Sequence, residues 1–292
     1  MNAESKSKSR PSFGNQEFTD YPQLLDALAT LPVLQRGYKR VFRGQTKDHG
    51  KMLPSGLRGK PIQNRALWGA YSLIVAADLM RTSGKIQVET DQEMLRFGIQ
   101  TISQHYGPGS EFLDVTHSVD VALWFALHAT QEALGRELLS AKFRDWPIGD
   151  YQYEFERVPW VKYSIWTESP GFLYIFDVPE WSATDVYSIP RHGELVDLLK
   201  PSLLEVLKQS KRIQVQEACL VKADPNVHGG DLHDFYACEP IHVKWPMEGA
   251  PGLGRSNEEI FPSPSEAPWY NQFISAPFVD KVDNQTKKLT TA

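Results

Sequence analysis

The stretch LDVTHSVDVALWF, from Leu113 to Phe125, carries the strongest information about the fold. From Val119 onward it is apolar on nearly every side, and a helix of that kind is buried over most of its surface. We therefore expect a central helix that begins at Val119 and runs toward Leu134. Thr116 or Ser118 is expected at its N-cap, because small hydroxyl residues favour that position.

The remaining elements follow from periodicity and residue type. Strands are predicted at residues 37–45, 171–178, 185–189, 212–223 and 239–246. Helices are predicted at residues 18–31, 64–80, 93–103, 193–200 and 201–210. The two types alternate without a regular βαβ rhythm, which predicts an α+β fold: a single mixed domain with a buried central helix and a small sheet.

Composition limits the class of protein. The formal charge of −5 argues against a strong nucleic-acid footprint, which needs a basic face. The two cysteines are too few for a disulfide framework and lack metal-ligand spacing, so we expect reduced thiols, no metal site and a cytoplasmic location. The polar N-terminus and the short apolar runs predict neither a signal peptide nor a membrane span.

Changes in composition along the chain suggest three parts. Residues 1–16 are predicted to be a flexible N-terminal tail, residues 17–246 the folded domain, and residues 247–292 a Pro/Gly/Ser-rich C-terminal tail. No internal repeat is visible.

Arg43 is a candidate anion ligand, because it ends a predicted strand and precedes Gly44 and Gln45. A buried guanidinium without an anionic partner is costly. The partner is either a ligand or a carboxylate of the protein, and we expect Asp114 to pair with Arg43 or with Arg58.

The start of the central helix is a second candidate. Free N–H groups at a helix N-terminus suit a phosphate or carboxylate, and Thr116 and Ser118 would add hydroxyl donors. The alternative is simple capping by Ser118. His105 and Tyr106 follow a predicted helix, so each is either a site residue or part of a helix end.

The segment KRIQVQEA is the third candidate. If it is a strand, Gln214 and Gln216 share one face and form either a solvent edge or a ligand-binding pair. Glu217 then lies on the opposite face unless a bulge turns it. Dinucleotide-binding, phosphate-loop, zincin and nucleophile-elbow signatures are all absent.

Five ordered motifs give the chain a resemblance to the FRG domain family: FRGQ, LPSGLR, QHYG, FLDVTHS and VALWFAL. The family takes its name from the tripeptide that stands here as Phe42-Arg43-Gly44. Many members have Pro-Thr-Arg after QHYG, where this chain has Gly109-Ser110-Glu111, which removes an arginine from that position.

A more distant resemblance is to the ADP-ribosyltransferase fold. It implies NAD as a substrate, with Arg43 at the NAD phosphates or ribose, Thr116 and Ser118 at the nicotinamide, and Gln216 or Glu217 near the last motif. A carboxylate is needed beside the oxocarbenium-like centre, and Glu217, Glu111 and Asp114 are the candidates.

The predicted site combines these residues. The predicted catalytic residues are Arg43, His105, Gln216 and Glu217. The predicted ligand-binding residues are Gln45, Tyr106, Asp114, Thr116, Ser118 and Gln214. The resulting hypothesis is an NAD-consuming, ADP-ribosyltransferase-like enzyme, for example an effector in bacterial or phage conflict, with an unknown protein or nucleic-acid target. The alternatives are a non-catalytic module that binds a nucleotide-type or other phosphorylated small molecule, and an interaction protein in which these residues are structural.

Overall fold

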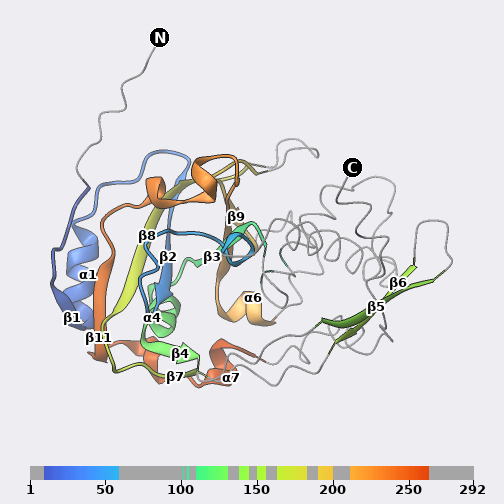
Figure 1. Cartoon of the computed structure of the whole chain (residues 1–292). Coiled ribbons are helices and arrows are strands. Elements are labelled where there is room, and N and C mark those ends of the chain that lie inside the picture. Colours follow the sequence, from blue (N-terminus) through green and yellow to red (C-terminus); the bar gives the residue numbers. More distant parts are fainter. Residues whose placement is uncertain are drawn as a thin grey trace, which may run out of the picture.

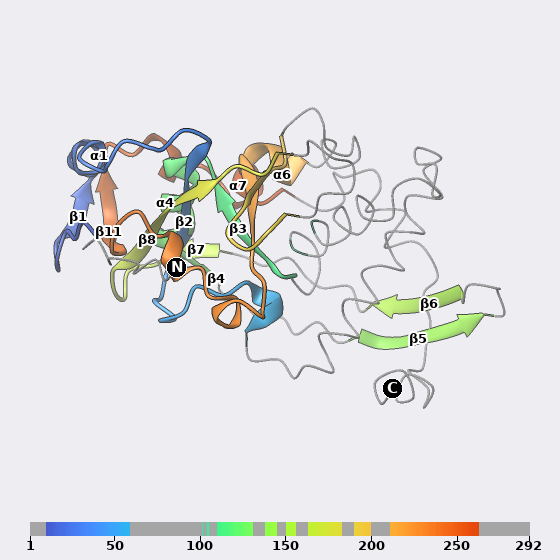
Figure 2. The ribbon, with the colours of Figure 1, turned by 90° about the horizontal axis from the view of Figure 1, so that it is seen from above.

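In the computed structural model, the described residues are 10–58, 101, 104, 110–130, 138–144, 150–155, 163–182, 190–199 and 211–262. They contain both helices and a mixed sheet, so the predicted α+β class is confirmed. The main sheet has seven strands in the order β1-β11-β8-β2-β3-β10-β9. Figure 2 shows these strands side by side from β1 on the left to β3 on the right.

The strands of the main sheet are β1 (Glu17–Asp20), β2 (Tyr38–Gln45), β3 (Phe112–Thr116), β8 (Gly171–Pro179), β9 (Leu195–Asp197), β10 (Ala218–Lys222) and β11 (Ile241–Glu248). Two small sheets pair β4 (His128–Thr130) with β7 (Tyr163–Ile165), and β5 (Leu138–Arg144) with β6 (Asp150–Phe155). The helices are α1 (Tyr21–Ala29), α4 (Val119–Leu127), α6 (Lys211–Val215) and α7 (Asn257–Ile260). Short 3-10 turns lie at Ser55–Leu57, His228–Gly230, His233–Phe235 and Pro251–Gly254.

Each face of the main sheet supports its own apolar cluster. One face packs against α1 and α4, and its cluster includes Leu24 and Leu123. The other face carries Val41 and Val115 and is covered by loop residues such as Met52. Figure 1 shows α1 beside β1 and α4 close to β2 and β8. This two-sided burial explains why β8 is an almost unbroken apolar run.

The predicted central helix is α4, and it begins at Val119 as expected. Ser118 is its N-cap and accepts a hydrogen bond from the Val121 N–H at 3.4 Å. The helix ends at Leu127, earlier than predicted, because the next residues form β4 and pair with β7. The Leu127 carbonyl then accepts from the Trp166 N–H at 2.7 Å instead of continuing the helix.

Gly44 lets α4 approach the sheet closely. A Cβ built at Gly44 would lie 1.7 Å from the Ala122 carbonyl oxygen, and one at Gly171 would lie 2.1 Å from the Ala126 carbonyl oxygen. Since these two glycines lie on the paired strands β2 and β8, they form a shallow seat for the helix. The glycine of the Phe42-Arg43-Gly44 motif therefore has a packing role.

Two predicted elements have the wrong type. Residues 212–216 were predicted in a strand, but Lys211–Val215 form α6 and only Ala218–Lys222 form a strand. Arg212 and Ile213 are adjacent and both buried, which suits a helix turn better than a strand exposed on alternate faces. Residues 195–197 were predicted in a helix, yet they form β9 because they pair with β10.

Other predictions are confirmed. The strands at β2, β8 and β11 are where the patterns placed them. The helix predicted at residues 18–31 is present as α1 but begins only at Tyr21, because residues 18–20 belong to β1 and pair with β11. No strand was predicted at the position of β3. The elements predicted at residues 64–80, 93–103, 185–189 and 201–210 lie outside the described residues, apart from Thr101.

Both expected tails include packed residues. Near the N-terminus, Phe13 meets the Phe18 ring edge-on and Pro11 accepts a backbone hydrogen bond from Glu239. Near the C-terminus, Leu253 and Ile260 are buried in the α4 cluster, which binds residues 247–262 to the domain. Composition alone misses this because the apolar anchors are sparse among polar neighbours.

Candidate functional site

The site is a cavity of about 310 Å³ that opens where two strands separate. β2 pairs with β3 only at Phe42 and Thr116, whereas it pairs with β8 along its whole length. Beyond that single pair the two strands diverge, and the cavity fills the opening. Its described lining residues are Phe42, Arg43, Gly44, Gln104, Asp114, Val115, Thr116, Val121, Ala122, Phe125, Tyr163, Arg212, Gln216, Ala218 and Phe261.

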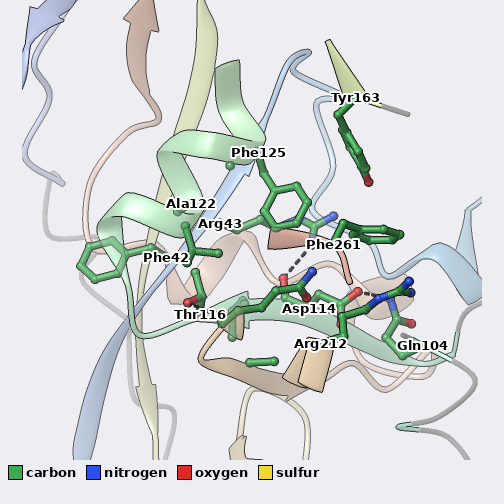
Figure 3. Close-up of a pocket in the computed structure, with 15 residues that line it drawn as sticks. Phe42, Arg43, Gln104, Asp114, Thr116, Ala122, Phe125, Tyr163, Arg212 and Phe261 are labelled. Atoms are coloured by element: carbon green, nitrogen blue, oxygen red, sulfur yellow. Dashed lines mark hydrogen bonds between the residues drawn. The ribbon is translucent and has the colours of Figure 1, made fainter. Parts of the chain in front are cut away.

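Arg43 lies in the gap between the diverging strands. Its Nη1 donates to the backbone carbonyl of Asp114 at 2.6 Å, as the dashed line in Figure 3 shows. Its buried Nε has no hydrogen-bond partner among the described residues. Burial lowers the pKa of Arg43, and the Asp114 carboxylate partly opposes that shift. The guanidinium is therefore held in place but not fully satisfied.

Arg58 brings a second positive charge close to Arg43. Burial and the Arg43 charge lower the pKa of Arg58 to about 10. Its Nε donates to the Leu53 carbonyl at 2.7 Å, whereas its buried Nη2 has no partner in the part of the chain that the structure describes. Two neighbouring guanidinium groups repel each other, so this arrangement favours an anion between or beside them.

Asp114 is the one carboxylate among the described lining residues. Its Oδ2 accepts from Gln104 Nε2 at 2.5 Å. The Gln104 Oε1 in turn accepts from the Ser110 N–H at 2.8 Å, which orients the amide. The predicted pairing of Asp114 with Arg43 takes the form of a contact through the backbone carbonyl, with the carboxylate acting on the guanidinium by charge.

Aromatic rings form one wall of the cavity. The Tyr163 ring lies 5.4 Å from Phe261 and 5.8 Å from Phe125, centroid to centroid. Figure 3 shows these three rings gathered on one side, above β3. Burial raises the pKa of Tyr163 to about 12, so its phenol is neutral at ordinary pH.

Arg212 contacts the aromatic wall and the last described residues, Phe261 and Pro262. Its guanidinium lies 3.7 Å over the Phe261 ring, a cation–π contact, and its Nη2 donates to the Pro262 carbonyl at 3.0 Å. Gln216 follows one helical turn later, and its Nε2 donates to the Ile260 carbonyl at 2.9 Å. Together these two side chains clamp residues 260–262 against α6 and hold Phe261 in the cavity wall.

Of the predicted site residues, Arg43, Asp114, Thr116 and Gln216 line the cavity. Two of them make contacts that hold the fold. Thr116 Oγ1 donates to the Gln216 carbonyl at 2.7 Å and accepts from the Ser118 N–H at 3.0 Å. The Gln216 amide is part of the clamp described above.

The other predicted residues lie elsewhere. Gln45 is buried beyond the lining, Ser118 caps α4, and Gln214 and Glu217 are exposed. His105 and Tyr106 lie outside the described residues. The N–H groups of Ser118 and Val121 are bound by the Thr116 and Ser118 hydroxyl oxygens, so these two side chains cap the start of α4.

Five lining residues were not predicted from the sequence: Gln104, Phe125, Tyr163, Arg212 and Phe261. One local signal was available: Arg212 and Gln216 are four residues apart, which places both on one face of a helix. The other residues come from segments far apart in the chain and converge only through the fold.

Comparison with known proteins identifies one part of the chain. Residues 38–134 match the model of the FRG domain. This range includes β2, β3 and α4 and therefore Arg43, Asp114 and Thr116 of the cavity. Searches of the curated proteins and of the solved structures found no match to the chain. Within the described ranges, no helix has both the length and the apolar character that crossing a membrane requires. Residues 38–134 are thus similar to the FRG domain, and the diverging strands β2 and β3 within this range supply Arg43 to the cavity.

Proposed function

We propose that the cavity binds a nucleotide-type small molecule through its phosphate groups, with NAD as the first candidate. The observation that carries the proposal is Arg43, which lines the cavity and has a buried Nε–H without a partner in the described chain. Arg58 is not one of the described lining residues, but it lies close enough for the Arg43 charge to lower its pKa. A phosphate at Arg43 would satisfy the unpaired N–H, because guanidinium groups bind phosphate oxygens by strong charge-assisted hydrogen bonds.

The opposite wall supports an aromatic ligand. Phe125, Tyr163 and Phe261 offer ring faces, and Arg212 adds a second cationic group behind Phe261. A nucleobase or nicotinamide ring would stack on such a wall. The cavity of about 310 Å³ lies at the lower end of the range for small-molecule sites, roughly 300–1,000 Å³, so it suits one half of a dinucleotide.

The proposed reaction is cleavage of the nicotinamide N-glycosidic bond of NAD, as the resemblance to ADP-ribosyltransferases suggests. The bond between ribose C1′ and the nicotinamide nitrogen would break, with the electron pair leaving on nicotinamide. Water or a nucleophile of the target would then form the new bond to C1′ and release its proton to solvent. A carboxylate stabilises the positive charge at C1′, and Asp114 is the candidate because Glu217 does not line the cavity.

A non-catalytic binding module is the second candidate. It is favoured by the engagement of Thr116, Gln104 and Gln216 in internal hydrogen bonds, which leaves few polar groups for chemistry. Both candidates share the same ligand-binding step and differ only in turnover.

Calorimetric titration with NAD and with ADP-ribose tests the binding step. We expect Arg43→Gln to weaken binding at least about tenfold, since a charged hydrogen bond contributes roughly 1.5–3 kcal/mol. Arg40→Gln is the matched control. Arg40 lies in the same strand but does not line the cavity, and its Nη2 donates to Asp177 Oδ2 at 2.7 Å. Absence of binding by the wild-type chain, or equal losses in the two variants, would remove the proposal.

Nicotinamide release separates the two candidates. If the chain is an enzyme, Asp114→Asn should retain ligand binding and lose turnover, because the amide can still accept from Gln104 but carries no charge. If the wild-type chain binds NAD and releases no nicotinamide, the binding module is the correct function.

A further inference from the structure

Three side chains with metal-ligand atoms meet near the β9 edge of the main sheet. The His117 ring nitrogen, an Asp197 carboxylate oxygen and the Cys219 sulfur all lie within 4.8 Å of one another. The His117 Nε2 and Asp197 Oδ2 atoms are 3.4 Å apart. None of the three residues lines the cavity described above.

Strand register explains this convergence. Cys219 of β10 lies opposite Asp197 of β9 on one side and opposite Val115 of β3 on the other. The His117 N–H donates to the Glu217 carbonyl at 3.3 Å, which extends the pairing of β3 and β10 by one residue. Since alternate residues of a strand share a face, His117 lies on the face of Val115 and Cys219. The cavity residues Asp114 and Thr116 face the other way.

We propose that His117, Asp197 and Cys219 form a Zn²⁺ site. Imidazole, carboxylate and thiolate are the three ligand types that protein zinc sites use. Tetrahedral Zn²⁺ with bonds of roughly 2.0–2.3 Å separates its ligand atoms by about 3.3–3.6 Å. The distance of 3.4 Å between the His117 and Asp197 atoms fits this range.

Access and charge also suit a cation. Cys219 is fully buried, whereas the side chains of His117 and Asp197 are 29% and 19% exposed, so solvent reaches one side of the cluster. The carboxylates of Asp197 and Glu217 lie near Cys219 and give the surroundings a negative potential, which attracts a cation. Three protein ligands with solvent on one side leave a coordination position for water or another small ligand.

The metal would have a structural effect. It would join β9 and β10 to the turn between β3 and α4, and His117 lies in that turn directly between Thr116 and Ser118. Zinc binding should therefore raise the melting midpoint of the whole chain, since a ligand that binds only the folded state stabilises it.

Titration of the purified full-length chain with Co²⁺, a spectroscopic stand-in for Zn²⁺, tests this proposal. We expect about one equivalent to produce a thiolate-to-metal charge-transfer band and the visible bands of a tetrahedral site. Cys219→Ser should lose the charge-transfer band, whereas Cys238→Ser should keep it. Cys238 is a matched control because it is also a free, buried thiol.

Zn²⁺ calorimetry provides a second measurement if Cys219→Ser does not fold. His117→Gln and Asp197→Asn change partly exposed side chains, and each should weaken Zn²⁺ affinity at least about tenfold. The proposal is overturned if the wild-type chain gives no thiolate band, if the band survives Cys219→Ser, or if the His117→Gln and Asp197→Asn variants both bind Zn²⁺ as the wild type does.

Discussion

Gly44 shows how a single residue can have both a packing role and a position in the site. Its neighbour Arg43 contributes charge to the cavity, while Gly44 itself allows the Ala122 carbonyl to lie against β2. The pair therefore links the packing of α4 to the placement of the guanidinium.

We predict that Gly44→Ala destabilises the fold strongly. The new Cβ would overlap a backbone carbonyl at 1.7 Å, so α4 must move, and overpacking costs about 1–3 kcal/mol and occasionally more. Urea unfolding measures the loss. Gly254→Ala is the control, because a Cβ there meets nothing within 4 Å. Equal stabilities of the two variants would show that α4 does not sit on Gly44.

Tyr163 gives the second single-residue prediction. Burial raises its pKa from 10 to about 12, so the stability that the neutral phenol contributes is complete below pH 10 and is lost as the pH rises toward 12. The shift of about two units corresponds to roughly 2–3 kcal/mol.

The free energy of unfolding at pH 8 and at pH 11 measures this effect. Tyr163→Phe should lose less stability than the wild type over that interval, because phenylalanine cannot ionise. The same pH dependence in both proteins would mean that the Tyr163 phenol is solvated.

Among the elements, α6 is the one whose position matters most for the cavity. It has only five residues, yet Arg212 and the following Gln216 fix residues 260–262 and so complete the aromatic wall. Glu217, with φ of 44°, then turns the chain into β10.

We predict that Gln216→Ala loosens this clamp. Ile260 is fully buried, and its carbonyl would lose the hydrogen bond from Gln216. An unsatisfied buried acceptor lowers the free energy of unfolding by about 1–3 kcal/mol. Hydrogen exchange should become faster at the Ile260 and Phe261 amides. The exposed neighbour provides the control, since Gln214→Ala should change stability by less than about 0.5 kcal/mol. Unchanged exchange in Gln216→Ala would indicate that Arg212 alone holds the segment.

Elements with strong local patterns could be predicted from the sequence. β2, β8 and the start of α4 have dense apolar or aromatic runs and clear boundaries. α6 was misassigned because Ile213 and Val215 alternate with two glutamines and so imitate a strand. β9 was misassigned because its three residues become a strand only by pairing with β10.

The cavity residues likewise fall into those that a local pattern could predict and those that it could not. Arg43, Asp114 and Thr116 lie within two short motifs and were identified from their chemistry. Phe261 and Tyr163 reach the cavity only through long-range packing, which no local pattern reports. The hydrogen bond from Arg43 to the Asp114 backbone carbonyl could not be predicted either, because every residue has such a carbonyl.

The two proposed sites lie on different parts of one sheet. The cavity extends from α4 into the gap where β2 and β3 diverge, and residues 260–262 close its wall. The His117, Asp197 and Cys219 cluster lies near β9, on the face of Val115. Thr116 lines the cavity and His117, the next residue, belongs to the metal-ligand cluster. Binding at one site should therefore change the affinity of the other.

If Arg43 and its neighbours form an anion-binding cavity for a nucleotide, crystals of the full chain soaked with ADP-ribose should hold the ligand there. We expect density for a phosphate at the Arg43 guanidinium and for a ring against Phe261 or Tyr163. An empty cavity in crystals that hold the ligand elsewhere, or no ligand density at all, would show that the cavity is not a nucleotide site.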